Sequence, residues 1–135
     1  MVFLHGCPSD SEEFLSKFPA FIYMQYQVFA VDLPGYGAST GKCQPSRSEN
    51  VLDEGGPADT IKFVIRSLQL GTPVLYGYDW GGCIAMKMGI QNSKGFSKII
   101  ALHPSYNETE KDELKKLKTP TMLQWVKQDQ LHPWG

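Results

Sequence analysis

The sequence has few of the features that assign a chain to a class at first sight. Its three cysteines, Cys7, Cys43 and Cys83, lie far apart and form no CxxC pair, which argues against a disulfide framework or a structural zinc site. No run of about 18 apolar residues is available to span a membrane. The first residues also lack the basic flank and apolar length of a signal peptide. We therefore expect no membrane insertion and a cytoplasmic or other intracellular compartment.

An excess of charge of either sign is also missing. The chain has 13 Lys and Arg against 14 Asp and Glu, a formal net charge of −1, so it offers no basic surface for nucleic acid. Gly35-Tyr36-Gly37 does not continue as GxGxxG, which argues against a dinucleotide site. We expect no cofactor and no metal. The length of 135 residues and the 41% apolar content fit one domain over residues 1–135.

Strand and helix patterns alternate along the chain. Short buried strands are predicted by apolar, β-branched or aromatic runs at Met1 to Leu4, Gln27 to Val31, Pro73 to Tyr76, Lys98 to Leu102 and Pro120 to Val126. Helical patterns lie between them at Glu13 to Phe18, Pro57 to Leu70, Gly82 to Ile90 and Glu110 to Lys118. The alternation predicts an α/β fold with a mostly parallel sheet flanked by helices.

Some helix ends also have recognisable signals. Ser9 with Glu12 fits a capping box ahead of the first helix, and Pro19 is expected to interrupt that helix. Gly71 suits the C-terminal cap of the second helix, which would then have about four turns. Residues 37 to 56 form the one long irregular stretch.

Three predicted strands end in segments suited to a functional site, because ligands bind at the carboxyl ends of parallel strands. These segments are His5-Gly6-Cys7-Pro8, Asp32 to Ser39 (DLPGYGAS), and Gly77-Tyr78-Asp79-Trp80-Gly81-Gly82. The third has the form of a nucleophile elbow, in which Gly77 and Gly81 permit a sharp turn from strand to helix and Asp79 is the exposed central residue. A purely structural Gly-Asp turn has the same short pattern.

In this order the three segments resemble the α/β-hydrolase fold, and the GYDWGG elbow is similar to that of epoxide hydrolases and haloalkane dehalogenases. The similarity runs from Met1 to about Pro133. It implies that Asp79 attacks an epoxide carbon or a carbon that carries a halide, and forms an ester that water then hydrolyses. The implied substrate is a small, apolar electrophile.

The resemblance also implies roles for other residues. The backbone N–H groups of Cys7 and Trp80 occupy the oxyanion-hole positions, and the Trp80 indole either donates to a departing halide or forms an aromatic wall. Thr119 to Asp129 is similar to the family's P-T-L-x-x-x-G-x-x-D segment, with Val126 in place of Gly. Asp129 is thereby expected to be the second catalytic residue, the acid that orients a histidine.

Three further residues, His5, Tyr78 and His103, are expected to line the substrate pocket. His5 is expected to position its own loop rather than to transfer protons. The family's catalytic histidine lies on a loop after one further strand, and neither His103 nor His132 matches that position.

The sequence also departs from the family in extent, since no room is left for a cap domain and the leading and terminal strands are lacking. Two alternatives to a self-sufficient hydrolase follow. The chain is either catalytically incomplete and acts as a structural or binding subunit, or it is a fragment that a partner chain, or a second copy, completes at an exposed sheet edge.

Overall fold

The computed structural model describes residues 1–39, 52, 56–104 and 111–124. Strands and helices alternate as the sequence predicts. In chain order the elements are β1 (Val2–Leu4), the 3-10 helix η1 (Ser11–Lys17), α1 (Phe18–Tyr23), β2 (Phe29–Val31), α2 (Pro57–Ser67), β3 (Val74–Tyr78), α3 (Trp80–Gln91), β4 (Lys98–Leu102), α4 (Lys111–Leu114) and β5 (Thr121–Gln124).

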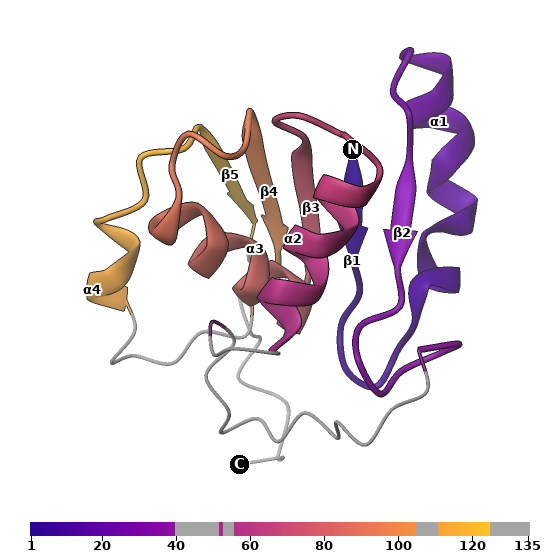
Figure 1. Ribbon diagram of the computed structural model, residues 1–135, viewed down its shortest axis with the longest axis horizontal. Coiled ribbons are helices and arrows are strands. Elements are labelled where there is room, and N and C mark those ends of the chain that lie inside the picture. Colours follow the sequence, from indigo (N-terminus) through magenta and orange to yellow (C-terminus); the bar gives the residue numbers. More distant parts are fainter. Residues whose placement is uncertain (40–51, 53–55, 105–110, 125–135) are drawn as a thin grey trace, which may run out of the picture.

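The five strands form one parallel sheet in the order β2-β1-β3-β4-β5. Leu4 of β1 pairs with Val31 of β2 on one side and with Gly77 of β3, the central strand, on the other. Because all strands run the same way, their carboxyl ends meet at one edge, at the bottom of Figure 1. The three segments singled out in the sequence therefore converge at that edge, and the predicted α/β class with a parallel sheet is confirmed.

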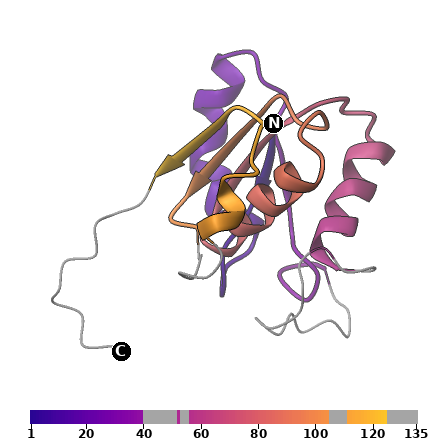
Figure 2. The same ribbon diagram turned by 90° about the vertical axis from the view of Figure 1, so that its left-hand side faces the viewer.

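The sheet is covered on both faces because its side chains alternate. Val2 and Leu4 pack into the larger core beneath α2 and α3, whereas Phe3 points to the other face, toward η1 and α1. Figure 2 shows α1 and α2 on opposite sides of the sheet. Phe3 lies in an aromatic cluster, with its ring centroid 4.8 Å from that of Tyr76 and 5.1 Å from that of Phe14.

Helix α3 is apolar on nearly every side, as the sequence predicts for a buried helix. It packs against β1, β3 and β4 and also contacts α2 and α4. The consecutive residues Ile84, Ala85 and Met86 are all fully buried. Because consecutive side chains point to different sides of a helix, neighbouring elements must cover α3 on more than one side. This helix begins directly after Asp79 and fixes the position of the elbow relative to the sheet.

The ends of the first helical segment differ from expectation. Asp10, not Ser9, is the N-cap of η1, and its side chain accepts a hydrogen bond of 2.9 Å from the Glu12 N–H. Pro19 does not interrupt a helix. It lies in the first turn of α1, where a missing N–H costs no hydrogen bond. The chain therefore passes from η1 into α1 without a break.

Two other helices are shorter than predicted. Helix α2 ends at Ser67, and Gln69 takes the left-handed conformation (φ 51°) before Gly71 is reached. Helix α4 has only four residues. The charge pattern correctly indicates that a helix is present at α4. Its end depends instead on Leu114 and Leu117, which pack against the larger core as the chain turns toward β5.

Candidate active site

The elbow between β3 and α3 depends on two glycines. A Cβ atom added to Gly77 would lie 2.3 Å from the carbonyl oxygen of Gly81, and one added to Gly81 would lie 2.1 Å from that of Leu4. Both contacts are with backbone, so a larger residue has no room. The close approach forces Asp79 into a conformation with φ 50° and ψ −114°, which is unfavourable for a non-glycine residue.

The Asp79 carboxylate is held at the carboxyl edge of the sheet. Its Oδ2 accepts a hydrogen bond of 3.2 Å from the Cys7 N–H, while its backbone N–H donates to the Leu102 carbonyl at 2.9 Å. Asp79 is the N-cap residue of α3, yet its side chain makes no capping hydrogen bond. The carboxylate is thus oriented by the loop after β1 rather than used by the helix.

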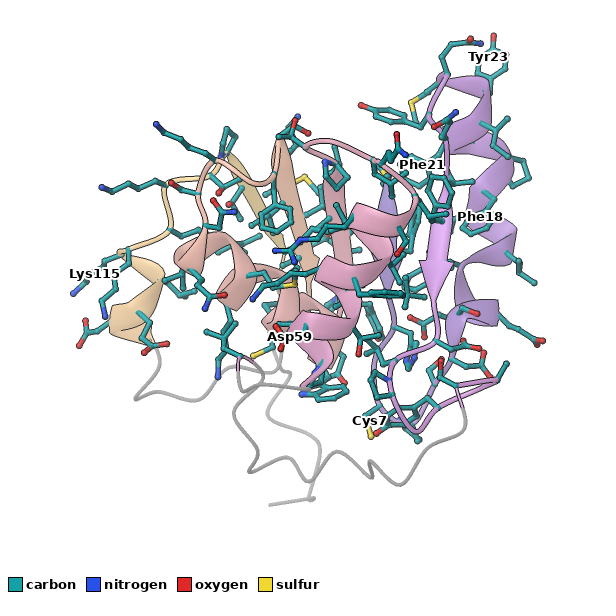
Figure 3. All side chains as sticks on the ribbon, in the orientation of Figure 1. Cys7, Phe18, Phe21, Tyr23, Asp59 and Lys115 are labelled. Carbon is teal, nitrogen blue, oxygen red and sulfur yellow. The ribbon has the colours of Figure 1, made fainter. Side chains whose placement is uncertain are left out.

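The two expected oxyanion-hole residues flank this carboxylate. Cys7 is on the loop after β1, at the lower end of the molecule in Figure 3. Trp80 is the first residue of α3, so its N–H has no acceptor within the helix. Tyr36, from the second strand exit, joins them: its hydroxyl donates to Cys7 Sγ at 3.1 Å and its ring centroid lies 6.2 Å from that of Trp80. Tyr36 lies within the DLPGYG segment, but no feature of that segment alone distinguishes it as a site residue.

His5 is completely buried, and both of its ring nitrogens have partners. Nε2 accepts a hydrogen bond of 3.0 Å from the Leu33 N–H, so Nδ1 is the protonated nitrogen and donates to the Gly6 carbonyl at 2.7 Å. The neutral ring ties the loop after β1 to the loop after β2. Neither nitrogen is left to hydrogen-bond a substrate, and His5 is not among the residues that line the cavity at Tyr78 and His103.

Tyr78 and His103 lie side by side at the ends of β3 and β4. Their rings meet edge to face with centroids 5.8 Å apart, and Tyr78 is 41% exposed. His103 has φ 47°, and its N–H donates to the Gln124 carbonyl at 2.7 Å. Both side chains line a cavity of about 330 Å³ that also reaches Phe14 and Tyr76. The structure therefore places these two predicted pocket residues together next to Asp79.

Asp129 and His132 lie outside the described residues, so the structure gives no position for the expected acid or for that histidine. In the described part of the chain, no cluster of His, Cys, Asp and Glu has an arrangement suited to a metal ion. Among the same residues, no helix combines the length and the apolar character needed to cross a membrane.

Asp32 organises the turn that carries Tyr36. Its Oδ1 accepts from the Ser11 N–H and its Oδ2 from the Ala38 N–H, each at 2.8 Å. Burial alone would raise the pKa of this carboxyl, but the hydrogen bonds from Ser11 and Ala38 outweigh burial and hold the pKa below its usual value of 3.8. The charged form of Asp32 is therefore the form that stabilises the turn.

We expect Asp32→Asn to lower the free energy of unfolding by about 1–2 kcal/mol at neutral pH, because one of the two acceptors becomes a donor. A lowered pKa contributes stability above the unfolded-state value, and this contribution is lost as the pH falls through the folded-state value. The difference in the free energy of unfolding between wild type and Asp32→Asn should therefore shrink below about pH 4. Urea unfolding of both proteins at pH 6 and at pH 3 measures this difference. Asp10→Asn, an exchange between equally favoured N-cap residues, is the control, and a difference that does not change with pH would contradict the prediction.

Residues 1–134 match the alpha/beta hydrolase fold family. The chain, with its five-stranded parallel sheet and a tight strand-to-helix turn after the central strand β3, belongs to this family. Its relatives include Protein ABHD14A of Mus musculus, 29% identical over 126 residues that make up 91% of this chain and 49% of the relative. Epoxide hydrolase 4 of Mus musculus is 34% identical over 108 residues, 78% of this chain and 29% of the relative.

A solved structure extends the comparison. The crystal structure of a predicted CIB-like hydrolase from Thermoplasma acidophilum matches with a TM-score of 0.78 and 25% identity, and it covers 98% of this chain and 64% of the other. The chain thus spans about half the length of ABHD14A and less than a third of epoxide hydrolase 4. The fold and the family are shared with these proteins.

Proposed function

We propose that this chain carries the nucleophile of a hydrolase that opens epoxides or displaces halide through a covalent ester on Asp79. The observation that carries the proposal is the Asp79 carboxylate, which lies at a strained elbow, is not used as a helix cap, and accepts a hydrogen bond from the Cys7 N–H. The relatives named epoxide hydrolase, and a haloalkane dehalogenase that is 28% identical over 101 residues, support the same chemistry.

In the first step Oδ1, the oxygen that does not accept from Cys7, attacks the electrophilic carbon. A carbon–oxygen bond forms to Asp79 while the epoxide carbon–oxygen bond or the carbon–halogen bond breaks. An epoxide oxygen leaves as an alkoxide and takes a proton from water or an acid, whereas a halide leaves as the ion. In the halide case the Trp80 indole N–H is a suitable donor to the departing ion.

In the second step water adds to the carbonyl carbon of the ester, and negative charge develops on Oδ2. The N–H groups of Cys7 and Trp80, together with the N-terminal end of α3, stabilise that charge. Collapse of this intermediate releases the alcohol and restores the carboxylate. The proton of the attacking water goes to a base, for which His103 and His132 are the candidates because both nitrogens of His5 are engaged. Asp129 is the acid proposed to orient that base.

A single-turnover reaction with styrene oxide in heavy-oxygen water tests this mechanism. The label should enter the Asp79 carboxylate, because water attacks the enzyme-bound ester at its carbonyl carbon, and mass spectrometry of the Asp79 peptide measures it. The same peptide from protein incubated in heavy-oxygen water without the epoxide is the control. Label found in the diol alone would show that water attacks the epoxide directly, and would exclude the ester.

A second candidate function is supported by the edge of the sheet at β5. Within the described residues β5 pairs with β4 alone, and Met122 and Leu123 are 50% and 37% exposed. An open edge of this kind can pair with a further strand. The chain would then be a subunit that a partner, or a second copy, completes. Sedimentation that shows a soluble monomer with hydrolase activity would exclude this alternative.

A further inference from the structure

We propose that the cavity beside Asp79 binds a small molecule in which an ammonium group is attached to an apolar body. The proposal goes beyond the hydrolase function and does not require Asp79 to be a nucleophile. It names a ligand class by the chemistry of the cavity walls. These walls include three aromatic rings, the aliphatic side chain of Leu102 and one carboxylate with a buried oxygen that has no hydrogen-bond partner among the described residues, and Lys17, His103 and Gln124 complete them.

The cavity lies between η1 and the carboxyl ends of β3, β4 and β5, on the sheet face opposite α3. Its volume of about 330 Å³ falls in the lower part of the range for small-molecule sites. Tyr78 lines it and directly precedes Asp79, and Leu102, another lining residue, accepts the hydrogen bond from the Asp79 N–H. A ligand in the cavity would therefore lie next to the elbow.

Three aromatic rings form much of the wall. Phe14, Tyr76 and Tyr78 all line the cavity, and the first two meet edge to face with centroids 5.9 Å apart. One of these rings already attracts an ammonium group, because Lys17 Nζ lies 5.6 Å from the centroid of Phe14. Aromatic faces favour organic cations through their quadrupoles.

The fourth element of the wall is the Glu13 side chain. Its Oε1 is buried and accepts no hydrogen bond from any described residue. Lys17, which lines the same cavity, forms no ion pair with this carboxylate, and its Nζ donates instead to the main-chain carbonyl of Glu13 at 3.3 Å. The negative charge reaches the cavity, because burial and then the charge of Glu13 raise the pKa of Tyr76.

These features favour a cation over the other ligand classes. A buried carboxylate oxygen without a hydrogen-bond partner, such as Glu13 Oε1, is unfavourable, and a positive charge nearby offsets its desolvation. Glu13 would repel an anion. A neutral molecule would gain binding free energy only from burial of its apolar part. A metal ion is disfavoured as well, because one carboxylate among aromatic rings supplies too few oxygen ligands.

Calorimetric titration of the complete chain with phenethylamine and with 2-phenylethanol tests the proposal, because the two probes share a body and differ in charge. We expect the amine to bind at least about ten-fold more tightly than the alcohol. Glu13→Gln should remove that preference and leave binding of the alcohol within about two-fold. Glu12→Gln, which alters an exposed carboxylate one residue away, is the matched control and should change neither affinity.

Lys17→Met provides a second test that does not depend on how well Glu13→Gln folds. Removal of the ammonium that lies over Phe14 should strengthen binding of phenethylamine about two- to three-fold. Equal binding of amine and alcohol to the wild type, no binding of either at millimolar concentration, or an unchanged preference in Glu13→Gln would each overturn the proposal. Weaker binding of the amine to Lys17→Met would also overturn it. None of these outcomes bears on Asp79, whose role is measured by isotope labelling.

Discussion

Replacing Asp79 with asparagine is expected to abolish formation of the covalent ester and to leave the fold intact. Asn has nearly the same size, tolerates a positive φ, and keeps an oxygen that can accept from the Cys7 N–H. Its amide, however, is a very poor nucleophile toward carbon. Removal of a nucleophile commonly costs several orders of magnitude, so we expect turnover of a reactive epoxide to fall at least about 1,000-fold.

Rapid-quench mass spectrometry with styrene oxide measures this effect directly. The wild-type chain should gain the mass of one substrate molecule, and Asp79→Asn should gain none. Asp59→Asn is the control, because Asp59 is a carboxylate on a different element, α2, where it pairs with Lys62 at 3.4 Å. An adduct that forms equally in Asp79→Asn would show that another residue is alkylated, and would remove Asp79 from the mechanism.

The sequence predicts the sheet and the elbow well because both depend on local signals. An apolar run between turn residues is sufficient to indicate a buried strand, and all five predicted strands are present. The pair Gly77 and Gly81 predicts a tight strand-to-helix turn because no side chain fits there. The helix ends were less accurate: Asp10 and Ser9 are both good N-cap residues, and only the course of the chain determines which of them caps η1.

The walls of the site could not be predicted in the same way because they depend on contacts between distant segments. Glu13 and Phe14 look like ordinary residues of an amphipathic helix. They become cavity residues only because η1 packs on the face of the sheet that carries Tyr76. Similarly, the fixed tautomer of His5 depends on Leu33, which lies 28 positions further along the chain.

The close packing of Gly81 against Leu4 at the elbow also contributes to the stability of the fold. Gly81→Ala is expected to lower the free energy of unfolding by at least about 3 kcal/mol, because its Cβ would overlap the Leu4 carbonyl. No rotamer change relieves a clash with backbone. β1 would have to move away from α3, and the Cys7 N–H would move away from Asp79 with it.

Urea unfolding of wild type, Gly81→Ala and Gly71→Ala separates this packing effect from a general effect of glycine replacement. Gly71 has φ +63° and nothing within 4 Å of an added Cβ, so Gly71→Ala carries only the strain of a left-handed alanine, about 1 kcal/mol. If both variants lost the same stability, conformational strain would account for the result and the close contact with Leu4 would have no part in it. A much larger loss in Gly81→Ala would assign the effect to the close packing of β1 against α3, the same packing that brings the loop after β1, with the Cys7 N–H, beside Asp79.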